Sequence, residues 1–464
     1  MKGTVEACYL THRMWGWGYR MNAKARQLIV CGTLFDSCTG TVKNDIAILV
    51  EGDRVAEVAP FASFAGRTGA VEGEDGQNAL SRVSDALDAV PIDLSHLFVM
   101  PGLIEGHAHI GMDPALSMDR MFLYGGFGEI TVRSIRNAQA DLLAGFTTVR
   151  DEASFSYTDV DVRNMIDRGE IWGPRLKVSG MALTSTGGHA DVRYRPGMGA
   201  ITFPEAYIAY VVNGADEARR AARNVIKYGV DVVKLMATGG VLSGDASVGA
   251  PDLAYDEMKA ACDIAHAHGK IVSAHAHGAQ GIKDAIRAGV TSIEHGTLID
   301  EEGCELMVER GVYHIPTLIA HHTSVEKGAR GEIPQLYYEK ALQCEESAAT
   351  GLTRLHELGA KVGFGTDAGT PGNPHGAQAD EFRLVMEAGG FTAVEVLQAA
   401  TVVNAQMLGM TGQVGSLAVG AYADIAAFDG DPLQDIRAMG RCSFVMKGGT
   451  VYKRDGAAQV PQGV

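Results

Sequence analysis

Short runs of β-branched and apolar residues occur near both ends of the chain. Three runs precede residue 60, separated by glycines: 28–31, 45–51 and 54–58. The same texture returns over 414–428, and two apolar runs flank Gly448-Gly449 within 442–453, which predicts a hairpin. We expect both ends to form one small β-sandwich. Residues 65–90, rich in Gly, Ala, Asp and Ser, are expected to be an irregular loop.

The middle of the chain alternates short apolar runs with longer Ala/Glu/Arg-rich helical patterns, which is typical of βαβ units. Helical patterns cover 215–228, 255–268 and 278–288. Eight candidate strands can be counted, ending near His107, Arg150, Ser179, Lys234, His275, His295, Pro316 and Asp367. Eight such units predict an α/β fold of the (β/α)8 TIM-barrel type, with its chemistry at the C-terminal ends of the strands.

These patterns predict four segments. Residues 1–26 are an N-terminal extension, with Met1 or Met21 as the start, and residues 27–97 are the first part of the β-sandwich. Residues 98–412 are the barrel. Residues 413–464 are the second part of the β-sandwich and a tail.

Composition narrows the function classes. The 464 residues include 40 Lys+Arg and 56 Asp+Glu, a net charge of −16, which argues against a nucleic-acid partner. No apolar run approaches the roughly 18 residues that cross a bilayer, so we expect a soluble protein without a membrane partner. The seven cysteines form no C-x-x-C pair, which favours a reducing, cytoplasmic compartment. The expected partner is a small-molecule substrate.

Histidine pairs need a structural context, because 15 histidines give about 0.5 H-x-H patterns by chance and this chain has three. His266 and His268 lie at the end of a predicted helix, where imidazoles interact favourably with the helix dipole. His107 and His109 follow an apolar strand. Their spacing of two points both rings to one side, as shared metal ligation requires.

Other chemically capable side chains end other strands. His275 and His295 close strands five and six, and each alone is equally well explained as a core histidine. Lys234 closes strand four and Asp367 strand eight, for which a salt-bridged lysine and a helix N-cap are the structural alternatives. Together, four imidazoles, a carboxylate and an amine converge on one barrel mouth. This donor set suits divalent metals such as Zn²⁺.

At this point the chain resembles the metal-dependent amidohydrolase superfamily, and the resemblance covers nearly all of it. It looks most like the branch of Xaa-Pro and Xaa-Arg dipeptidases (prolidase-like enzymes) and ochratoxin amidohydrolases. Five motifs carry the resemblance: P-G-L-I-E-G-H-A-H (101–109), V-K-L-M-A-T-G-G (233–240), H-A-H-G (275–278), I-E-H-G (293–296) and G-T-D-A-G (365–369). Glu105 departs from the Asp of many relatives.

The resemblance implies a binuclear metal centre. His107, His109 and Asp367 would hold one ion, and His275 and His295 the other. Lys234, carboxylated by CO₂, would bridge them. Zn²⁺ is expected first, with Mn²⁺, Co²⁺ and Fe²⁺ as alternatives.

The resemblance also implies a reaction. A hydroxide bridging the metals would attack an amide carbonyl, and catalytic Asp367 would move its proton to the leaving nitrogen. The expected substrates are N-acyl amino acids or dipeptides. The same chemistry on a urea, carbamate or thiocarbamate xenobiotic, or on a cyclic amide, is the alternative. A non-catalytic scaffold is the third reading. By resemblance we expect a homo-oligomer.

The sequence offers weaker signals for the residues that would contact the substrate. His189, in the Gly-rich loop after strand three, is expected to hydrogen-bond the carbonyl oxygen during catalysis, or else is a plain loop histidine. Residues 189–213 read as a lid. The weaker pocket candidates are Tyr124, Phe127, His277, His321, His322 and His375.

Overall fold

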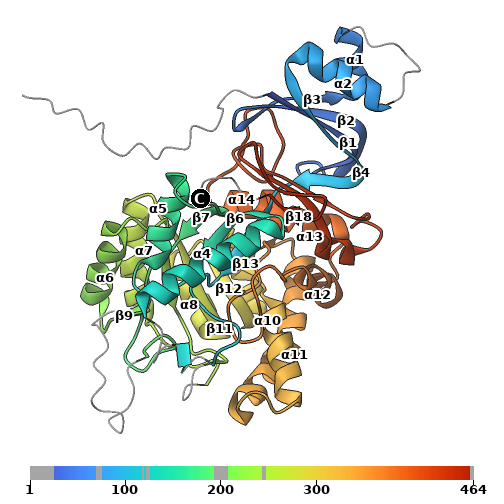
Figure 1. The fold of residues 1–464 in the computed structure, drawn as a ribbon. Coiled ribbons are helices and arrows are strands. Elements are labelled where there is room, and N and C mark those ends of the chain that lie inside the picture. Colours follow the sequence, from blue (N-terminus) through green and yellow to red (C-terminus); the bar gives the residue numbers. More distant parts are fainter. Residues whose placement is uncertain are drawn as a thin grey trace, which may run out of the picture.

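A computed structural model of the chain describes residues 26–68, 76–117, 120–121, 126–192, 207–242 and 247–459. Strands from both ends of the chain form a sheet at one end of the molecule. The larger α/β body contains the parallel strands and most of the helices (Figure 1). The lid expected over 189–213 lies largely outside the described residues.

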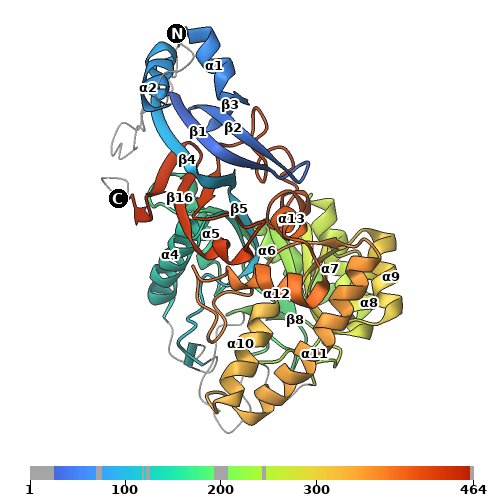
Figure 2. The same ribbon diagram turned by 90° about the vertical axis from the view of Figure 1, so that its right-hand side faces the viewer.

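The end sheet has eight strands in the order β18-β17-β16-β15-β4-β1-β2-β3. Their bounds are β1 Arg26–Asp36, β2 Thr41–Glu51, β3 Arg54–Pro60, β4 Ala89–Pro101, β15 Ile425–Phe428, β16 Cys442–Lys447, β17 Thr450–Arg454 and β18 Ala457–Ala458. The predicted hairpin is confirmed, since β16 and β17 pair antiparallel with Lys447 opposite Thr450. Figure 2 shows the blue N-terminal and red C-terminal strands together.

The expected β-sandwich is not confirmed. β4 pairs with β1 on one side and with β15 on the other, so strands from both ends of the chain join one hydrogen-bonded layer. One face of this sheet is covered by two helices, α1 (Phe61–Thr68) and α2 (Gly76–Leu87). Alternate residues such as Ile29 and Ile48 pack in a separate core on the other face.

The irregular loop expected over 65–90 is wrong for most of its length. Leu80 and Val83 are buried at helical spacing in α2, where they pack with Phe64 of α1 against Leu28 and Leu49 of the sheet. A stretch rich in small and polar residues therefore forms a helix because Leu80 and Val83, with the partly buried Leu87, cover a sheet face.

The body contains two parallel sheets. The seven-stranded sheet runs β14-β13-β12-β11-β10-β8-β9, and the three-stranded sheet runs β5-β6-β7. Their bounds are β5 Leu103–Ala108, β6 Phe146–Asp151, β7 Arg175–Val178, β8 Ala182–Thr184, β9 Ala209–Val211, β10 Val232–Met236, β11 Ile271–Gly278, β12 Ser292–Leu298, β13 Tyr313–Ile315 and β14 Lys361–Val362. β4 leads into β5 with only Gly102 between them.

The described strands do not form one closed sheet, so the closed barrel is not confirmed. The expected third strand, ending near Ser179, corresponds to β7, which pairs with β6, whereas β8 was not predicted and pairs with β10 and β9. Gly180, with φ +60°, lies between β7 and β8. Backbone bonds span both seams: the Asp231 amide donates to the Val178 carbonyl at one, and at the other the segment 364–368 pairs with the end of β5, as in the bond from the Gly106 amide to the Phe364 carbonyl.

Helices follow most of the parallel strands, and their inward faces share one large apolar core with the sheets. The α-helices of the body are α4 Phe127–Leu143, α5 Thr158–Asp167, α6 Ala215–Lys227, α7 Tyr255–Ala267, α8 Ala279–Ala288, α9 Glu301–Arg310, α10 Leu318–Ala329, α11 Gln335–Glu357, α12 Asp380–Gly389, α13 Ala393–Gln398 and α14 Asn404–Met407. A π-helix spans Ala399–Val403, and a 3-10 helix spans Ile436–Gly440. Among the described helices, none is both long and apolar enough to span a membrane.

Candidate metal centre and its pocket

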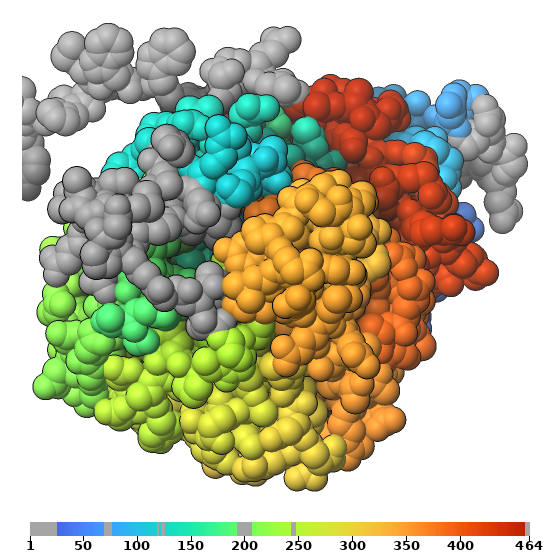
Figure 3. Space-filling model, turned by 90° about the horizontal axis from the view of Figure 1, so that it is seen from below, coloured from blue at the N-terminus to red at the C-terminus, as the bar shows by residue number. Residues whose placement is uncertain are grey.

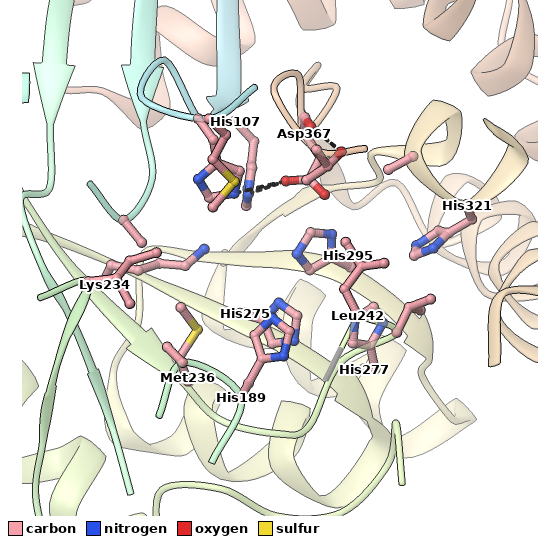
Figure 4. A pocket seen from close by; sticks show the side chains of 18 of the residues that line it. His107, His189, Lys234, Met236, Leu242, His275, His277, His295, His321 and Asp367 are labelled. Carbon is pink, nitrogen blue, oxygen red and sulfur yellow. Dashed lines mark hydrogen bonds and ion pairs between the residues drawn. The ribbon is translucent and has the colours of Figure 1, made fainter. Parts of the chain in front are cut away.

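One pocket gathers the side chains that end the parallel strands. Its described lining combines seven histidines, Lys234 and Asp367 with an apolar wall. Figure 4 shows these side chains pointing toward one another from separate strands and loops. α10 contributes His321 to the lining, and in Figure 3 the orange α10 and α11 stand out from the face of the molecule seen there.

The first group of candidate ligands comprises His107, His109 and Asp367. One ligand atom of each lies within 4.8 Å of the others. His107 Nε2 is 3.3 Å and His109 Nε2 is 3.0 Å from Asp367 Oδ1. Burial opposes ionisation of Asp367, but the bonds to the two imidazoles outweigh it and hold its pKa far below the usual range. The Asp367 carboxylate of this group is therefore ionised.

The second group comprises His275, His277 and His295, whose ligand atoms also lie within 4.8 Å of one another. His295 Nδ1 lies 2.7 Å from Thr317 Oγ1, and His277 Nδ1 lies 2.8 Å from Thr297 Oγ1. Burial lowers the pKa of all three imidazoles well below the usual value. They are neutral, which is the form that binds metal ions.

Lys234 lies between the groups as a buried amine. Its Nζ is 3.2 Å from Glu152 Oε2, yet it has no hydrogen-bond partner of good geometry among the described residues. Glu152 Oε2 already accepts a hydrogen bond from the Ser273 hydroxyl at 2.7 Å. The contact with Glu152 agrees with the structural alternative of a salt-bridged lysine, but it leaves the buried Nζ of Lys234 without a well-formed hydrogen bond.

A fully buried arginine ties the two sides of the pocket together. The Arg150 guanidinium donates to both Glu294 oxygens at 2.8 Å and lies 2.9 Å from Glu152. Glu294 in turn lies 2.7 Å from His107 Nδ1. Burial would raise the pKa of Glu294, but Arg150 and His107 hold it well below its usual range. This chain of charges fixes the ring of His107 with Nε2 toward Asp367.

Two of the candidate ligands have backbone angles that side chains rarely adopt. φ is +69° at His295 and +60° at Asp367. The left-handed conformation costs roughly 1–2 kcal/mol for a residue with a Cβ, so such angles are typical of functional sites. At His295 this turn of the backbone follows directly after Glu294, whose side chain reaches His107.

Glu105 stabilises the turn that carries the first group. Its carboxylate accepts from the His107 amide at 2.9 Å and from the Thr366 amide and hydroxyl at 3.0 and 2.8 Å. Complete burial raises its pKa to about 7. Glutamate at this position therefore links strand one to the loop that carries Asp367.

His189 reaches the pocket from a loop that Asp252 organises. The Asp252 carboxylate accepts from the Thr184 hydroxyl, the Ser185 amide and the His189 amide at 2.7–2.8 Å. The His189 ring stacks on His275, with centroids 4.2 Å apart. A Cβ at Gly240 would lie 2.3 Å from His189 Cε1, so the glycine makes room for this ring. Burial lowers the pKa of His189 to about 4.

The weaker candidates separate into two classes. His277 and His321 line the pocket, whereas His322 contacts Glu345 at 2.9 Å near the surface. His375 does not line it: its ring nitrogens contact Asp141 at 2.8 Å and the His109 carbonyl at 3.1 Å. Phe127 is exposed and packs against Tyr207. Tyr124 lies outside the described residues.

Sequence reasoning missed the residues that hold the candidate ligands in place. Arg150 marked the end of a strand, but its role was not foreseen, and neither were those of Glu152 and Glu294. A signal was available, because an arginine and a glutamate inside apolar strands are rarely buried unless paired. Asp252 carried no such signal, since its partners lie more than 60 residues away in sequence.

Comparison with known proteins gives a consistent result. A family model described as the amidohydrolase family matches residues 98–452. Ochratoxinase from Aspergillus niger is 31% identical over 373 residues, covering 77% of this chain and 76% of the relative.

Solved structures agree with the sequence comparison. A Xaa-Pro dipeptidase with bound methionine has a TM-score of 0.79 and 31% identity, covering 92% of this chain and 100% of that one. The crystal structure of Aspergillus niger ochratoxinase has a TM-score of 0.77 and 28% identity, covering 93% and 96%. Both neighbours extend across the end sheet as well as the body. The chain belongs to the amidohydrolase family.

Proposed function

We propose that this chain is a metal-dependent hydrolase that cleaves the C–N bond of an amide in N-acyl amino acids or dipeptides. The observation that carries the proposal is the convergence of two candidate ligand groups on one pocket, one containing an anionic carboxylate and the other only neutral imidazoles. The family membership supports it, and so do the names of the relatives, an ochratoxinase and a Xaa-Pro dipeptidase.

The donor chemistry fits a pair of divalent metal ions. His109 Nδ1 and Lys234 Nζ are buried without hydrogen-bond partners among the described residues, as expected where a bound group is to be accommodated. His107, His109 and Asp367 would hold one ion and His275 and His295 the other, with carboxylated Lys234 between them. Zn²⁺ suits this set best. When bound, the ions would activate a water molecule and polarise the substrate carbonyl.

The chain's own residues would manage the protons. Asp367, which is anionic and lines the pocket with a 13% exposed side chain, would accept a proton from the attacking water and deliver it to the leaving nitrogen. His189 is neutral at pH 7, so one ring nitrogen is a donor that can hydrogen-bond the carbonyl oxygen as charge develops on it. Glu294 and Arg150 would keep His107 oriented through the cycle.

The pocket wall bears on the substrate class. Its apolar part consists of Met112, Ala153, Ala190, Ile208, Met236, Val241, Leu242 and Ala320. An apolar acyl group or side chain beside the scissile bond fits this wall. Among the described lining residues, Lys234 is the only lysine, and there is no arginine. That favours, as a second candidate, a neutral urea, carbamate, thiocarbamate or cyclic amide, which has no carboxylate to bind.

A matched substrate panel tests the proposal. Purified, Zn²⁺-loaded protein supplied with bicarbonate is assayed with an N-acyl amino acid, its methyl ester at the carboxylate, an apolar dipeptide, an aryl urea and a carbamate. We expect amide cleavage with apolar acyl groups, lost in His107→Ala and Lys234→Ala variants that remain folded by circular dichroism. Faster hydrolysis of the urea or carbamate selects the second candidate. Hydrolysis of none of them by folded, metal-loaded protein contradicts both.

A further inference from the structure

The second ligand group contains one more histidine than the proposed two-metal centre uses. The ring centroids of His275 and His277 are 4.7 Å apart, those of His277 and His295 are 4.9 Å apart, and those of His275 and His295 are 4.7 Å apart. All three side chains are buried. His277 is therefore placed as a third member of the group and not as a distant wall residue (Figure 4).

Two threonines orient this group for binding a cation. Thr297 holds His277 through Nδ1, and Thr317 holds His295 through Nδ1, so in both rings Nε2 is the nitrogen left for an ion. Hydrogen bonding of the outer ring nitrogen is the usual way in which proteins aim a metal-binding imidazole. The His277 backbone is fixed as well, since its amide donates to the Thr238 hydroxyl at 2.9 Å.

The state of Lys234 decides whether the extra imidazole matters. An unmodified lysine ammonium has no lone pair for a metal ion, and Lys234 Nζ, 3.2 Å from Glu152 Oε2, would remain paired with that carboxylate. In that state the ion beside His275 and His295 would keep only two protein ligands. Zinc sites in proteins use three or four, and three imidazoles suffice in a His₃ site.

We propose that His275, His277 and His295 form a three-imidazole site that binds one divalent metal ion while Lys234 is unmodified. The chain would then hold this ion without carbon dioxide, and His277 would be a metal ligand in that state. The inference adds a ligand to the metal centre of the proposed function, but it does not depend on hydrolysis. The burial of all three side chains and the approach of their ligand atoms to within 4.8 Å of one another support it.

Cobalt binding to a variant that retains only this group tests the inference. His109→Ala and Asp367→Asn disable the first group, and Lys234→Met removes the amine that CO₂ would modify. The metal-free protein is titrated with Co²⁺ in CO₂-depleted buffer, with the visible absorption of Co²⁺ and metal analysis as readouts. We expect one Co²⁺ per chain.

Adding His277→Ala to this background should weaken Co²⁺ binding by more than about 100-fold, because loss of an outer partner alone costs about 10–100-fold. Thr297→Val should fall in that smaller range. His321→Ala is the matched control, since His321 lines the same pocket with its ring 5.6 Å from His277 but belongs to neither group. Circular dichroism and thermal unfolding of each metal-free variant establish folding.

Three results would overturn the inference: no Co²⁺ bound in the background variant, binding unchanged by His277→Ala, or equal loss in His321→Ala. If the background variant does not fold, metal analysis of the natural chain and of His277→Ala in CO₂-free buffer makes the same distinction. The natural chain should retain the ion of this group and the variant should lose it. Hydrolysis by bicarbonate-supplied protein is scored separately, so either proposal can fail alone.

Discussion

The two ligand groups of the pocket are built differently. In the first group, carboxylates contact the imidazoles. Asp367 contacts His107 and His109, and Glu294 contacts the other ring nitrogen of His107. In the second, threonine hydroxyls take that place on His277 and His295. The contacts with Asp367 and Glu294 raise the pKa of His107, in spite of burial and Lys234, whereas burial leaves the second group well below the usual value.

If the proposed function holds, this difference would give the two groups different tasks within one cavity, with proton transfer confined to the first. A site that moves protons needs a charged group whose ionisation is supported by its neighbours, and the first group has one in Asp367. A site that only holds a cation needs neutral donors with fixed directions, and the second group has these. Changes at Asp367, Glu294 and His321 should therefore affect different measured quantities.

The largest effect is expected for Asp367→Asn. The amide keeps an oxygen near His107 and His109 but cannot carry a proton, so kcat should fall by about 10²–10⁴-fold. Steady-state hydrolysis with metal analysis measures this. Asp380→Asn, at an exposed aspartate paired with Arg383, is the matched control and should retain activity. A loss of less than tenfold in Asp367→Asn would assign proton transfer to another group.

The second-largest effect is expected for Glu294→Gln, which should lower the free energy of unfolding. The change leaves Arg150 with a weaker partner in a fully buried position, and breaking a buried ion pair costs about 3–5 kcal/mol. Urea unfolding of the metal-free protein measures this loss. Glu301→Gln removes a pair with Arg354 at the surface and should leave the midpoint unchanged. Equal effects of the two variants would show that the buried network has no special role.

A smaller effect is expected for the pH dependence of stability, through His321, which lines the pocket from α10. Burial lowers its pKa to about 4 in the folded chain, against 6.5 as the ordinary value. Above pH 6.5 the ring is neutral in both states. Below it the unfolded chain binds the proton first, so the free energy of unfolding falls between pH 6.5 and about 4, by at most about 3 kcal/mol from this group.

His321→Gln removes that titration, so metal-free variant protein should lose less stability over this interval than the natural chain. Urea unfolding at pH 7.0, 5.5 and 4.5 makes the comparison, with His322→Gln, at the surface partner of Glu345, as the control. Parallel pH profiles for the natural chain and His321→Gln would contradict the expected burial effect.

The sequence allowed the parallel strands to be located because each is a short apolar run ending in a polar residue. It did not show that a further strand, β8, follows Gly180 and joins the other sheet, since a lone glycine fits a turn, a bulge or a change of sheet equally well. The same limit applies to α2. Leu80 and Val83 are two apolar residues in a polar stretch, and only the sheet face beneath them makes their spacing meaningful.

For the site, strand ends were enough to bring His107, Lys234, His275, His295 and Asp367 into one pocket. Their binding of metal stays a prediction. The partners of these residues could not be read from the chain, because Arg150 meets Glu294 across 144 positions. His277 was predicted only as a weak pocket residue, for a different reason. Its spacing of two puts it on the same side of the strand as His275, but the contact of its Nδ1 with Thr297 depends on how strand six is placed.

The direct passage from β4 through Gly102 into β5 has a practical consequence. β5, which carries His107, continues directly from β4. β4 is held by hydrogen bonds between β1, from the N-terminal part of the chain, and β15, from the C-terminal part. Removing the terminal strands, or fusing a tag into them, would therefore weaken the support of the strand that carries His107.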